Sequence, residues 1–322
     1  MTTLKEKIMT KRNIGENSVK QYLRCLNALK KSIGQTEEDE MCECLTDFDK
    51  VMKYINSLEK MTTKKNKLTA VVVALDSCEV DKNIVDKYKD ALKKTNDEYN
   101  LFLNKQVKTE TQKKNWIEYP ELVKVANDLL NMVKAFKNKD NLSKMEYDVL
   151  LKCVLLQTHL EFPLRNDLSE VKIIKQVDYN KLKDKTKENY LVVQDKPLKM
   201  TFYFNHFKNH KSLGSLTMPV PKKLVNLYKI YFKHNKSDNF LTSIQDRQSP
   251  ITSNRQTKLF NDLFKQYYPD KSISSSLIRH IIISHLTKGE PTIKQKQEKK
   301  EKIKVKFQHS EKTNDTYRKI DD

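Results

Sequence analysis

Apolar residues recur with a helical period through most of the chain, and this period is interrupted once. Apolar side chains spaced three and four residues apart are typical of helices that bury one face. Between about residues 170 and 220 the pattern changes to β-branched and aromatic runs, which are typical of strands. These runs read EVKII, YLVV, KMTFYFNHF and GSLTMPV, and helical spacing resumes after them. The sequence therefore predicts a mainly helical fold with one small antiparallel sheet.

A polar segment, KQVKTETQKKN, separates two groups of predicted helices. Its charged and amide side chains favour a linker. We therefore expect a helical domain over residues 1–105, a linker over 106–115 and a second domain over 116–322. Within the first domain, Thr46 and Asp49 have the spacing of a capping box, which predicts that a helix begins there.

The chain has 322 residues and a net charge of +20, and most of its basic residues are lysines. A protein this basic attracts polyanions, because neutralising phosphates releases the counterions condensed on them. Double-stranded DNA is the leading partner on this ground, and a membrane surface is the weaker rival. Apolar runs stay shorter than the roughly 20 residues that span a bilayer, and we expect no membrane association.

Five cysteines are scattered over the first half of the chain. An odd count of this kind is not a disulfide framework. Cys42 and Cys44 are also followed by no second Cys or His pair that would complete a zinc site. We therefore expect reduced thiols and neither a metal nor a cofactor. With no secretory signal at the start, the expected location is intracellular: the nucleus or a viral factory if the source is eukaryotic or viral, the cytoplasm otherwise.

The seven arginines stand out against this lysine-rich background. A guanidinium can bind two phosphate oxygens at once, which an ammonium group cannot do. Cleavage of DNA by a tyrosine needs such donors on the phosphate. The phenol, with an ordinary pKa of about 10, must also lose its proton. The departing 5′ oxygen needs a general acid, and side-chain cations can make a metal unnecessary.

Four segments supply these parts in order along the chain. They are FPLRNDLSEV with Arg165, FNHFKNHKSLGSLTMPVP with Lys208 and Lys211, SSSLIRHIIISHL with Arg279, and HSEKTNDTYRK with His309 and Tyr317. Together they resemble the tyrosine recombinase (phage integrase) family, particularly its divergent members in large eukaryotic DNA viruses and mobile elements. The resemblance covers about residues 16–319. It implies a helical core-binding domain that clamps DNA, followed by a tyrosine-recombinase-like catalytic domain.

The resemblance also implies roles for these residues. Arg165 and Arg279 would clamp the scissile phosphate, and His309 would hydrogen-bond the phosphate or position the nucleophile. Tyr317 would form the 3′-phosphotyrosyl bond. A lysine of the predicted hairpin would protonate the leaving oxygen. We favour Lys208 because it directly follows an aromatic strand, and Lys211 remains the alternative.

Arg279 lies within an apolar helix, where a permanent charge is costly unless it is paired. Because no local carboxylate partner is apparent in the sequence, a DNA phosphate is the expected partner. The sequence departs from the family near this residue. Ser276 occupies the position that usually holds a histidine, and its hydroxyl can donate a hydrogen bond but cannot act as a base near neutral pH. His280 matches another common position of the family, which more often packs structurally.

The resemblance implies a DNA strand transferase, which is a site-specific recombinase or integrase. A type IB topoisomerase and a catalytically inactive DNA-binding protein of the same fold are the alternatives. The separate helical domain favours the recombinase, because such enzymes hold DNA from both sides. With five residues after Tyr317, the chain has little room for a docking helix. We therefore expect a monomer in free solution and a homotetramer on paired DNA sites.

Overall fold

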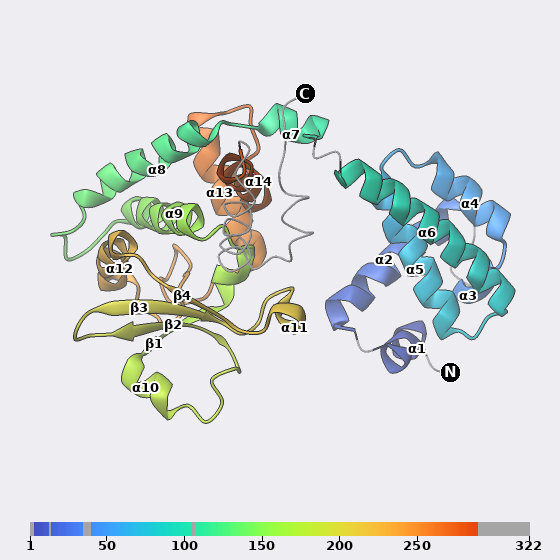
Figure 1. The fold of residues 1–322 in the computed structure, drawn as a ribbon, viewed down its shortest axis with the longest axis horizontal. Coiled ribbons are helices and arrows are strands. Elements are labelled where there is room, and N and C mark those ends of the chain that lie inside the picture. Colours follow the sequence, from blue (N-terminus) through green and yellow to red (C-terminus); the bar gives the residue numbers. More distant parts are fainter. Residues whose placement is uncertain (1–2, 13, 35–39, 105–106, 289–322) are drawn as a thin grey trace. The chain divides into compact units, whose positions relative to one another are not determined.

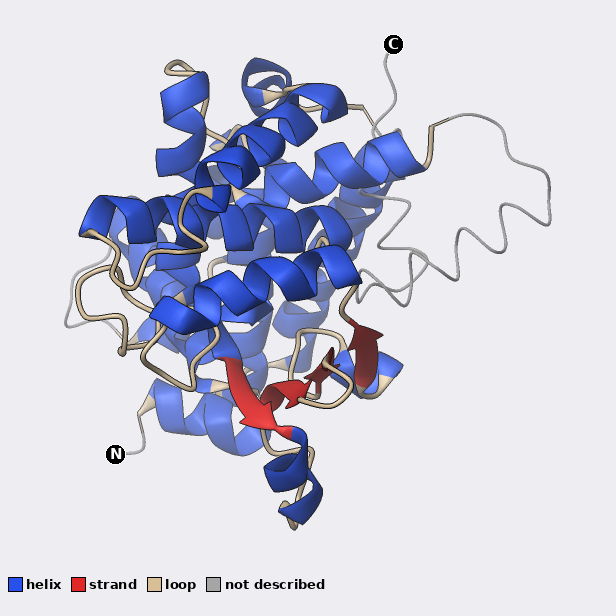
Figure 2. Ribbon diagram, turned by 90° about the vertical axis from the view of Figure 1, so that its left-hand side faces the viewer, coloured by secondary structure: helices blue, strands red, loops and turns tan. Residues whose placement is uncertain are grey.

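The computed structural model describes residues 3–12, 14–34, 40–104 and 107–288. Its contacts divide the chain into two compact units, residues 1–105 and 106–322. Figure 2 shows that the strands are a small part of a mainly helical chain, as the sequence predicts. Residues 289–322 lie outside the described part.

Helix α5 is the centre of the first unit. The helices of this unit are α1 (Leu4–Lys11), α2 (Glu16–Ser32), α3 (Met41–Cys44), α4 (Phe48–Ser57), α5 (Met61–Ser77) and α6 (Lys82–Asn104). α5 contacts α1, α2, α4 and α6 (Figure 1). Its run LTAVVVAL is apolar on nearly every side, which is typical of a helix enclosed by others. Leu68, Val71 and Leu75 are accordingly fully buried.

The start of α4 differs from the predicted capping box. Asp47 is the N-cap, and its carboxylate accepts a hydrogen bond of 3.0 Å from the backbone N–H of Lys50. The Thr46 hydroxyl instead donates to the carbonyl of Glu43 at 2.7 Å. Short polar side chains compete for the same backbone groups. Here the end of α3 engages the threonine, so the neighbouring aspartate caps α4.

Cys42 and Cys78 form a disulfide, which corrects the expectation of reduced thiols throughout. Cys42 belongs to α3 and Cys78 follows the end of α5, 36 residues later in the sequence. Folding brings the two sulfurs together. The number of cysteines in a sequence does not show which of them folding brings together. Cys25 and Cys153 are not part of this bond.

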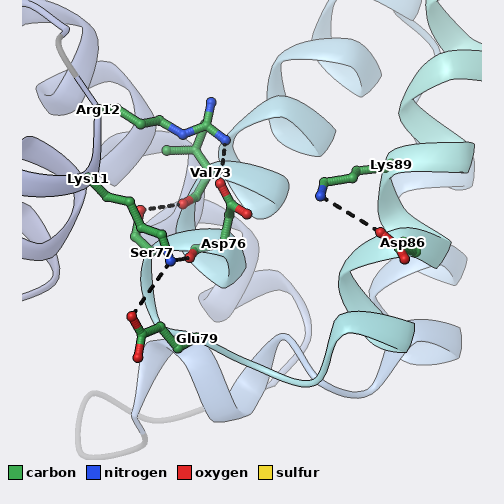
Figure 3. Close-up of polar contacts among 8 residues, drawn as sticks. All are labelled: Lys11, Arg12, Val73, Asp76, Ser77, Glu79, Asp86 and Lys89. Carbon is green, nitrogen blue, oxygen red and sulfur yellow. Dashed lines mark hydrogen bonds and ion pairs between the residues drawn. The ribbon is translucent and has the colours of Figure 1, made fainter.

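An ion pair joins the end of α1 to the end of α5 (Figure 3). Arg12 Nη2 lies 2.8 Å from Asp76 Oδ2, and Lys11 Nζ donates to the Asp76 carbonyl at 2.7 Å. The hydrogen bond from Arg12 lowers the pKa of Asp76 from its ordinary value of 3.8. Figure 3 also shows a local pair within α6, in which Lys89 Nζ lies 3.7 Å from Asp86 Oδ1.

The second unit surrounds its sheet with helices. These are α7 (Glu110–Asn115), α8 (Tyr119–Lys134), α9 (Lys144–Glu161), the 3-10 helix η1 (Asn166–Glu170), α10 (Gln176–Lys181), α11 (His210–Leu213), α12 (Lys222–His234), α13 (Ser253–Tyr267) and α14 (Ser275–Leu286). Across the described ranges of both units, we find no helix with the length and apolar content needed to cross a bilayer.

The sheet is mixed, although the sequence predicted an antiparallel one. In the described part of the chain its order is β1 (Val171–Lys175), β2 (Asn189–Gln194), β3 (Lys199–Phe204) and β4 (Leu216–Pro219). β1 pairs with β2 in parallel, whereas the β2–β3 and β3–β4 pairs are antiparallel. The cause is α10, because a crossover through a helix lets the next strand run in the same direction.

The two faces of the sheet pack against different helices. Leu191, Phe202 and Met218 lie in register on adjacent strands and belong to the main core, together with residues of α9 and α12. On the other face, Tyr179 of α10 packs against Tyr190 of β2. Figure 1 shows α10 on the side of the sheet opposite α9 and α12. β2 is buried at four consecutive positions, 189–192, which explains the continuous apolar run YLVV.

The segment expected to be a linker contains α7, which packs on the second unit. Thr109 and Gln112 form a capping box at its start. At its end, Asn115 Oδ1 accepts a hydrogen bond of 2.6 Å from the backbone N–H of Ser272. The polar residues of this segment are therefore largely the surface of a short, capped helix.

Replacing Arg12 with Gln should lower the free energy of unfolding at pH 7 by about 0.5–1 kcal/mol, because solvent screens a partly exposed pair. The folded-state pKa of Asp76 lies below its unfolded value. The stabilisation is therefore present above the unfolded pKa of about 4 and is lost as pH falls through the folded pKa. Urea denaturation at neutral and acidic pH should show the difference between wild type and variant shrinking in acid.

Lys89→Gln is the matched control, because it removes the same charge from a pair within one helix turn. Its effect should be smaller, since such pairs contribute about 0.3–0.5 kcal/mol. Equal losses in the two variants would show that the Arg12 pair does not fasten α1 to α5.

Candidate active site

A hydrogen bond joins the segments of the second unit that carry Arg165 and Arg279. Arg165 follows α9 and directly precedes η1. Arg279 lies in the middle of α14 with 2% of its surface exposed. Its Nε donates a hydrogen bond of 3.0 Å to the carbonyl of Pro163, two residues before Arg165. The helix that carries one arginine is thereby fastened to the segment that carries the other.

Asp167 is a carboxylate close to both arginines. Its Oδ2 is shut off from solvent. Burial raises the pKa of Asp167 to about 6, and the charges of Arg165 and Arg279 act in the opposite direction. Asp167 is therefore a carboxylate near Arg279 that was not apparent from the sequence. Asp167 itself is visible in the sequence two positions after Arg165, in FPLRNDLSEV. Its proximity to Arg279 follows only from the folded structure.

His159 is a buried histidine near the same arginines. Its Nδ1 donates to the carbonyl of Leu155 at 2.9 Å, and its ring packs edge-on against Phe260. Burial lowers the pKa of His159 to about 4, and the charge of Arg279 contributes in the same direction. The imidazole is therefore neutral near pH 7. His159 therefore adds no positive charge to those of Arg165 and Arg279.

Asn166 fixes the backbone between Arg165 and Asp167. Its Nδ2 donates to the carbonyl of Ser253 at 3.0 Å and to the hydroxyl of Thr257 at 2.9 Å. Both partners belong to α13. The turn that carries Arg165 is therefore held against α13 by its asparagine and against α14 by the carbonyl of Pro163.

Three other arginines have structural partners. Arg12 pairs with Asp76, and Arg255 lies 3.6 Å from Asp262 within α13. Arg247 donates to the carbonyl of Leu142 and lies over the ring of Tyr147, with 4.7 Å to the ring centroid. The scarcity of arginine in the sequence therefore does not by itself identify a catalytic residue. What sets Arg165 and Arg279 apart is their joint position around Asp167.

The two candidate lysines lie in the connection between β3 and β4. Lys208 is exposed in the turn that follows β3, and Lys211 is exposed in the short helix α11. Exposed ammonium groups on a turn can reach a phosphate that approaches from solvent. This position agrees with the predicted hairpin, but it does not distinguish one lysine from the other.

Ser276 and His280 lie one helix turn apart near the start of α14. Ser276 is exposed and His280 is half-buried, whereas Arg279 is buried. Both line a small pocket against α7, whose polar residues Thr111 and Gln112 form another part of its wall. The hydroxyl of Ser276 is thus open to a ligand. His309 and Tyr317 lie outside the described residues, and their predicted roles remain predictions.

The arginine cluster has the electrostatics of an anion site. The charges of Arg165 and Arg279 act on Asp167, whose pKa is about 6, and Glu170 is a second carboxylate within range. Guanidinium groups offer planar sets of N–H donors that match the oxygens of a phosphate. An anion with several oxygens is therefore the ligand that this cluster suits best.

Asp167→Asn should make stability less sensitive to rising pH. The folded pKa of about 6 lies above the ordinary value of 3.8. The ionised carboxylate therefore destabilises the fold increasingly as pH rises through this interval. Between pH 5 and pH 8 the wild type should lose about 1 kcal/mol relative to the variant. Urea denaturation at both pH values measures this change, and a constant difference between the proteins would contradict the burial of an ionisable Asp167.

Comparison with known proteins leaves the chain without an assigned family. No family model matches it, and no curated protein matches it in sequence. Among solved structures, it is similar to one described as the crystal structure of XerA recombinase, with a TM-score of 0.38 and 12% sequence identity. The alignment covers 99% of this chain and 94% of that one.

Proposed function

We propose that this chain is a site-specific DNA recombinase or integrase that cleaves and rejoins strands through a 3′-phosphotyrosyl bond. The observation that supports this best is the convergence of Arg165 and Arg279 around Asp167. The two arginines are 114 positions apart in the printed sequence. Only folding brings them together, and the resulting cluster suits a phosphate.

In the proposed reaction, the phenol oxygen of Tyr317 attacks the scissile phosphorus and its proton passes to a base or to solvent. The bond to the 5′ oxygen breaks, and the new bond is a 3′-phosphotyrosyl ester. Arg165 and Arg279 would stabilise the charge on the non-bridging oxygens. His309 would donate a hydrogen bond to the phosphate or hold the nucleophile. Rejoining reverses these steps with a 5′ hydroxyl as the attacking group.

The departing 5′ oxygen takes a proton from a general acid, for which we propose Lys208 with Lys211 as the alternative. The hydroxyl of Ser276 would serve as a hydrogen-bond donor near the same phosphate. All of these groups are side chains of the chain itself. The chemistry proposed here therefore calls for no metal ion.

The net charge of +20 supports double-stranded DNA as the partner. Exposed lysines lie on α2, α4 and α6 of the first unit, including Lys20, Lys53 and Lys93, whereas Lys64 of α5 is half-buried. These faces would bind phosphates, and affinity should fall as salt rises. Exchange of strands between two duplexes requires one subunit for each cleaved strand. A homotetramer on paired sites follows from that symmetry, with a monomer in free solution.

Tyr317→Phe should abolish the covalent protein–DNA adduct and leave DNA binding nearly unchanged, because it removes one hydroxyl. A nicked suicide duplex traps the adduct for detection by denaturing electrophoresis. Tyr203→Phe is the control, since it keeps the aromatic ring that stacks near Tyr179 and should form the adduct normally. An adduct that persists in Tyr317→Phe would assign the nucleophile elsewhere. An adduct without strand exchange between duplexes would favour the topoisomerase alternative.

Arg279→Lys should slow single-turnover cleavage about 10²- to 10³-fold, because a preorganised bidentate donor is lost from the transition state. Arg165→Lys should behave in the same way. Arg255→Lys is the matched control, since Arg255 belongs to an exposed pair on α13. Near-normal cleavage by both cluster variants would remove the basis of the proposed function, and DNA binding without any wild-type adduct would indicate an inactive DNA-binding protein.

A further inference from the structure

Asn189 is a buried amide that fastens the base of the lysine turn, residues 205–214. It is the first residue of β2 and 1% exposed. Its Oδ1 accepts hydrogen bonds of 2.8 Å from the backbone N–H groups of Asn205 and His206. Its Nδ2 donates to the carbonyl of His206, also at 2.8 Å. One side chain thus makes three hydrogen bonds to the two residues at which the turn leaves β3.

Asn205 extends the same network to a second loop. It is buried, and its Nδ2 donates to the carbonyls of Lys185 at 2.8 Å and Glu188 at 2.7 Å. These residues belong to the connection between α10 and β2. Polar groups are tolerated inside a protein when their hydrogen bonds are made. Here the two buried asparagines make them to main-chain atoms, so the network fixes backbone positions.

The rest of the lysine turn is held internally. Phe207 is buried in the main core, and its carbonyl lies 2.9 Å from His210 Nδ1. Gly214 has φ of +69° and donates from its N–H to the His210 carbonyl at 2.8 Å. Lys208 is thus exposed immediately after two anchored residues, His206 and Phe207. Its backbone is set, and the side chain remains able to reach outward.

We infer that Asn189 and Asn205 are positioning residues for the general acid of strand cleavage. This inference rests on the proposed function. A general acid must lie within hydrogen-bond reach of the leaving oxygen in the transition state. Misplacement of a catalytic group by about 1 Å can cost on the order of 100-fold in rate. The asparagines fix the backbone of the turn, so that the lysine is already positioned near the 5′ oxygen when the DNA binds.

The test uses a 5′-phosphorothiolate duplex, whose sulfur leaving group departs without a proton. Asn189→Ala should slow cleavage of the ordinary duplex by about 10- to 100-fold. The phosphorothiolate duplex should restore most of that loss, because the misplaced lysine is then not needed. Asn235→Ala is the control. Asn235 also makes side-chain hydrogen bonds to nearby main-chain groups, at Asn239 and Ser237, but in a different loop. The Asn235→Ala protein should therefore cleave both duplexes at the rates of the wild type.

Asn189→Asp provides a second variant in case the alanine variant does not fold. Its carboxylate still accepts from both N–H groups but cannot donate to the His206 carbonyl. It should show a smaller slowing with the same rescue. Each asparagine variant should also add little to Lys208→Ala, because residues that act through one group are not additive. If the asparagine variants instead add little to the slowing caused by Lys211→Ala, the general acid is Lys211.

Equal slowing on both duplexes would overturn the inference, since the asparagines would then support the fold without positioning the acid. Normal cleavage of the ordinary duplex by well-folded variants would overturn it as well. A wild-type protein that forms no adduct with either duplex would instead contradict the proposed function. Urea denaturation of each variant separates loss of the fold from loss of position.

Discussion

A guanidinium enclosed in the second unit is the constraint on which its arrangement depends. A buried charge costs several kcal/mol unless hydrogen bonds and opposite charge compensate for it. Arg279 therefore restricts α14 to a position where the Pro163 carbonyl and the charge of Asp167 are within reach. That position in turn sets the course of the chain between α9 and β1, where Arg165 lies. The contacts that hold the fold and those that assemble the candidate site are the same contacts.

Burial shifts the pKa values of the two titrating groups near the arginines in opposite directions. Burial lowers the pKa of His159 and raises that of Asp167, so each group favours its neutral form. The arginines remain charged throughout, His159 is neutral near pH 7, and Asp167 ionises as pH rises through about 6. A bound phosphate would add negative charge close to Asp167 and favour its protonated form. Binding of a phosphate at this cluster would therefore be linked to proton uptake by Asp167.

The sequence predicted the helices and strands better than it predicted how they pair and pack. Apolar periodicity identified the helices and strands because burial of one face requires it. It could not show that β1 and β2 run parallel, since α10 lies in a polar stretch between them. It also could not pair Cys42 with Cys78. For the site, FPLRNDLSEV and SSSLIRHIIISHL were recognised one by one, but the role of Asp167 depends on their packing together. Asn189 and Asn205 become partners only through the register of the β2–β3 pair.

The two parts of the candidate site are held by different kinds of contact, and this has a consequence for their pH dependence. The base of the lysine turn is fixed by the amides of Asn189 and Asn205, which do not titrate between pH 4 and pH 9. The arginine cluster contains a carboxylate with a pKa of about 6. The charge of the arginine cluster therefore changes with pH, while its geometry is held by the Pro163 carbonyl and by Asn166. In the proposed reaction, the strength of anion binding at the cluster would therefore vary with pH, while the amides at the base of the turn would hold the general acid in place.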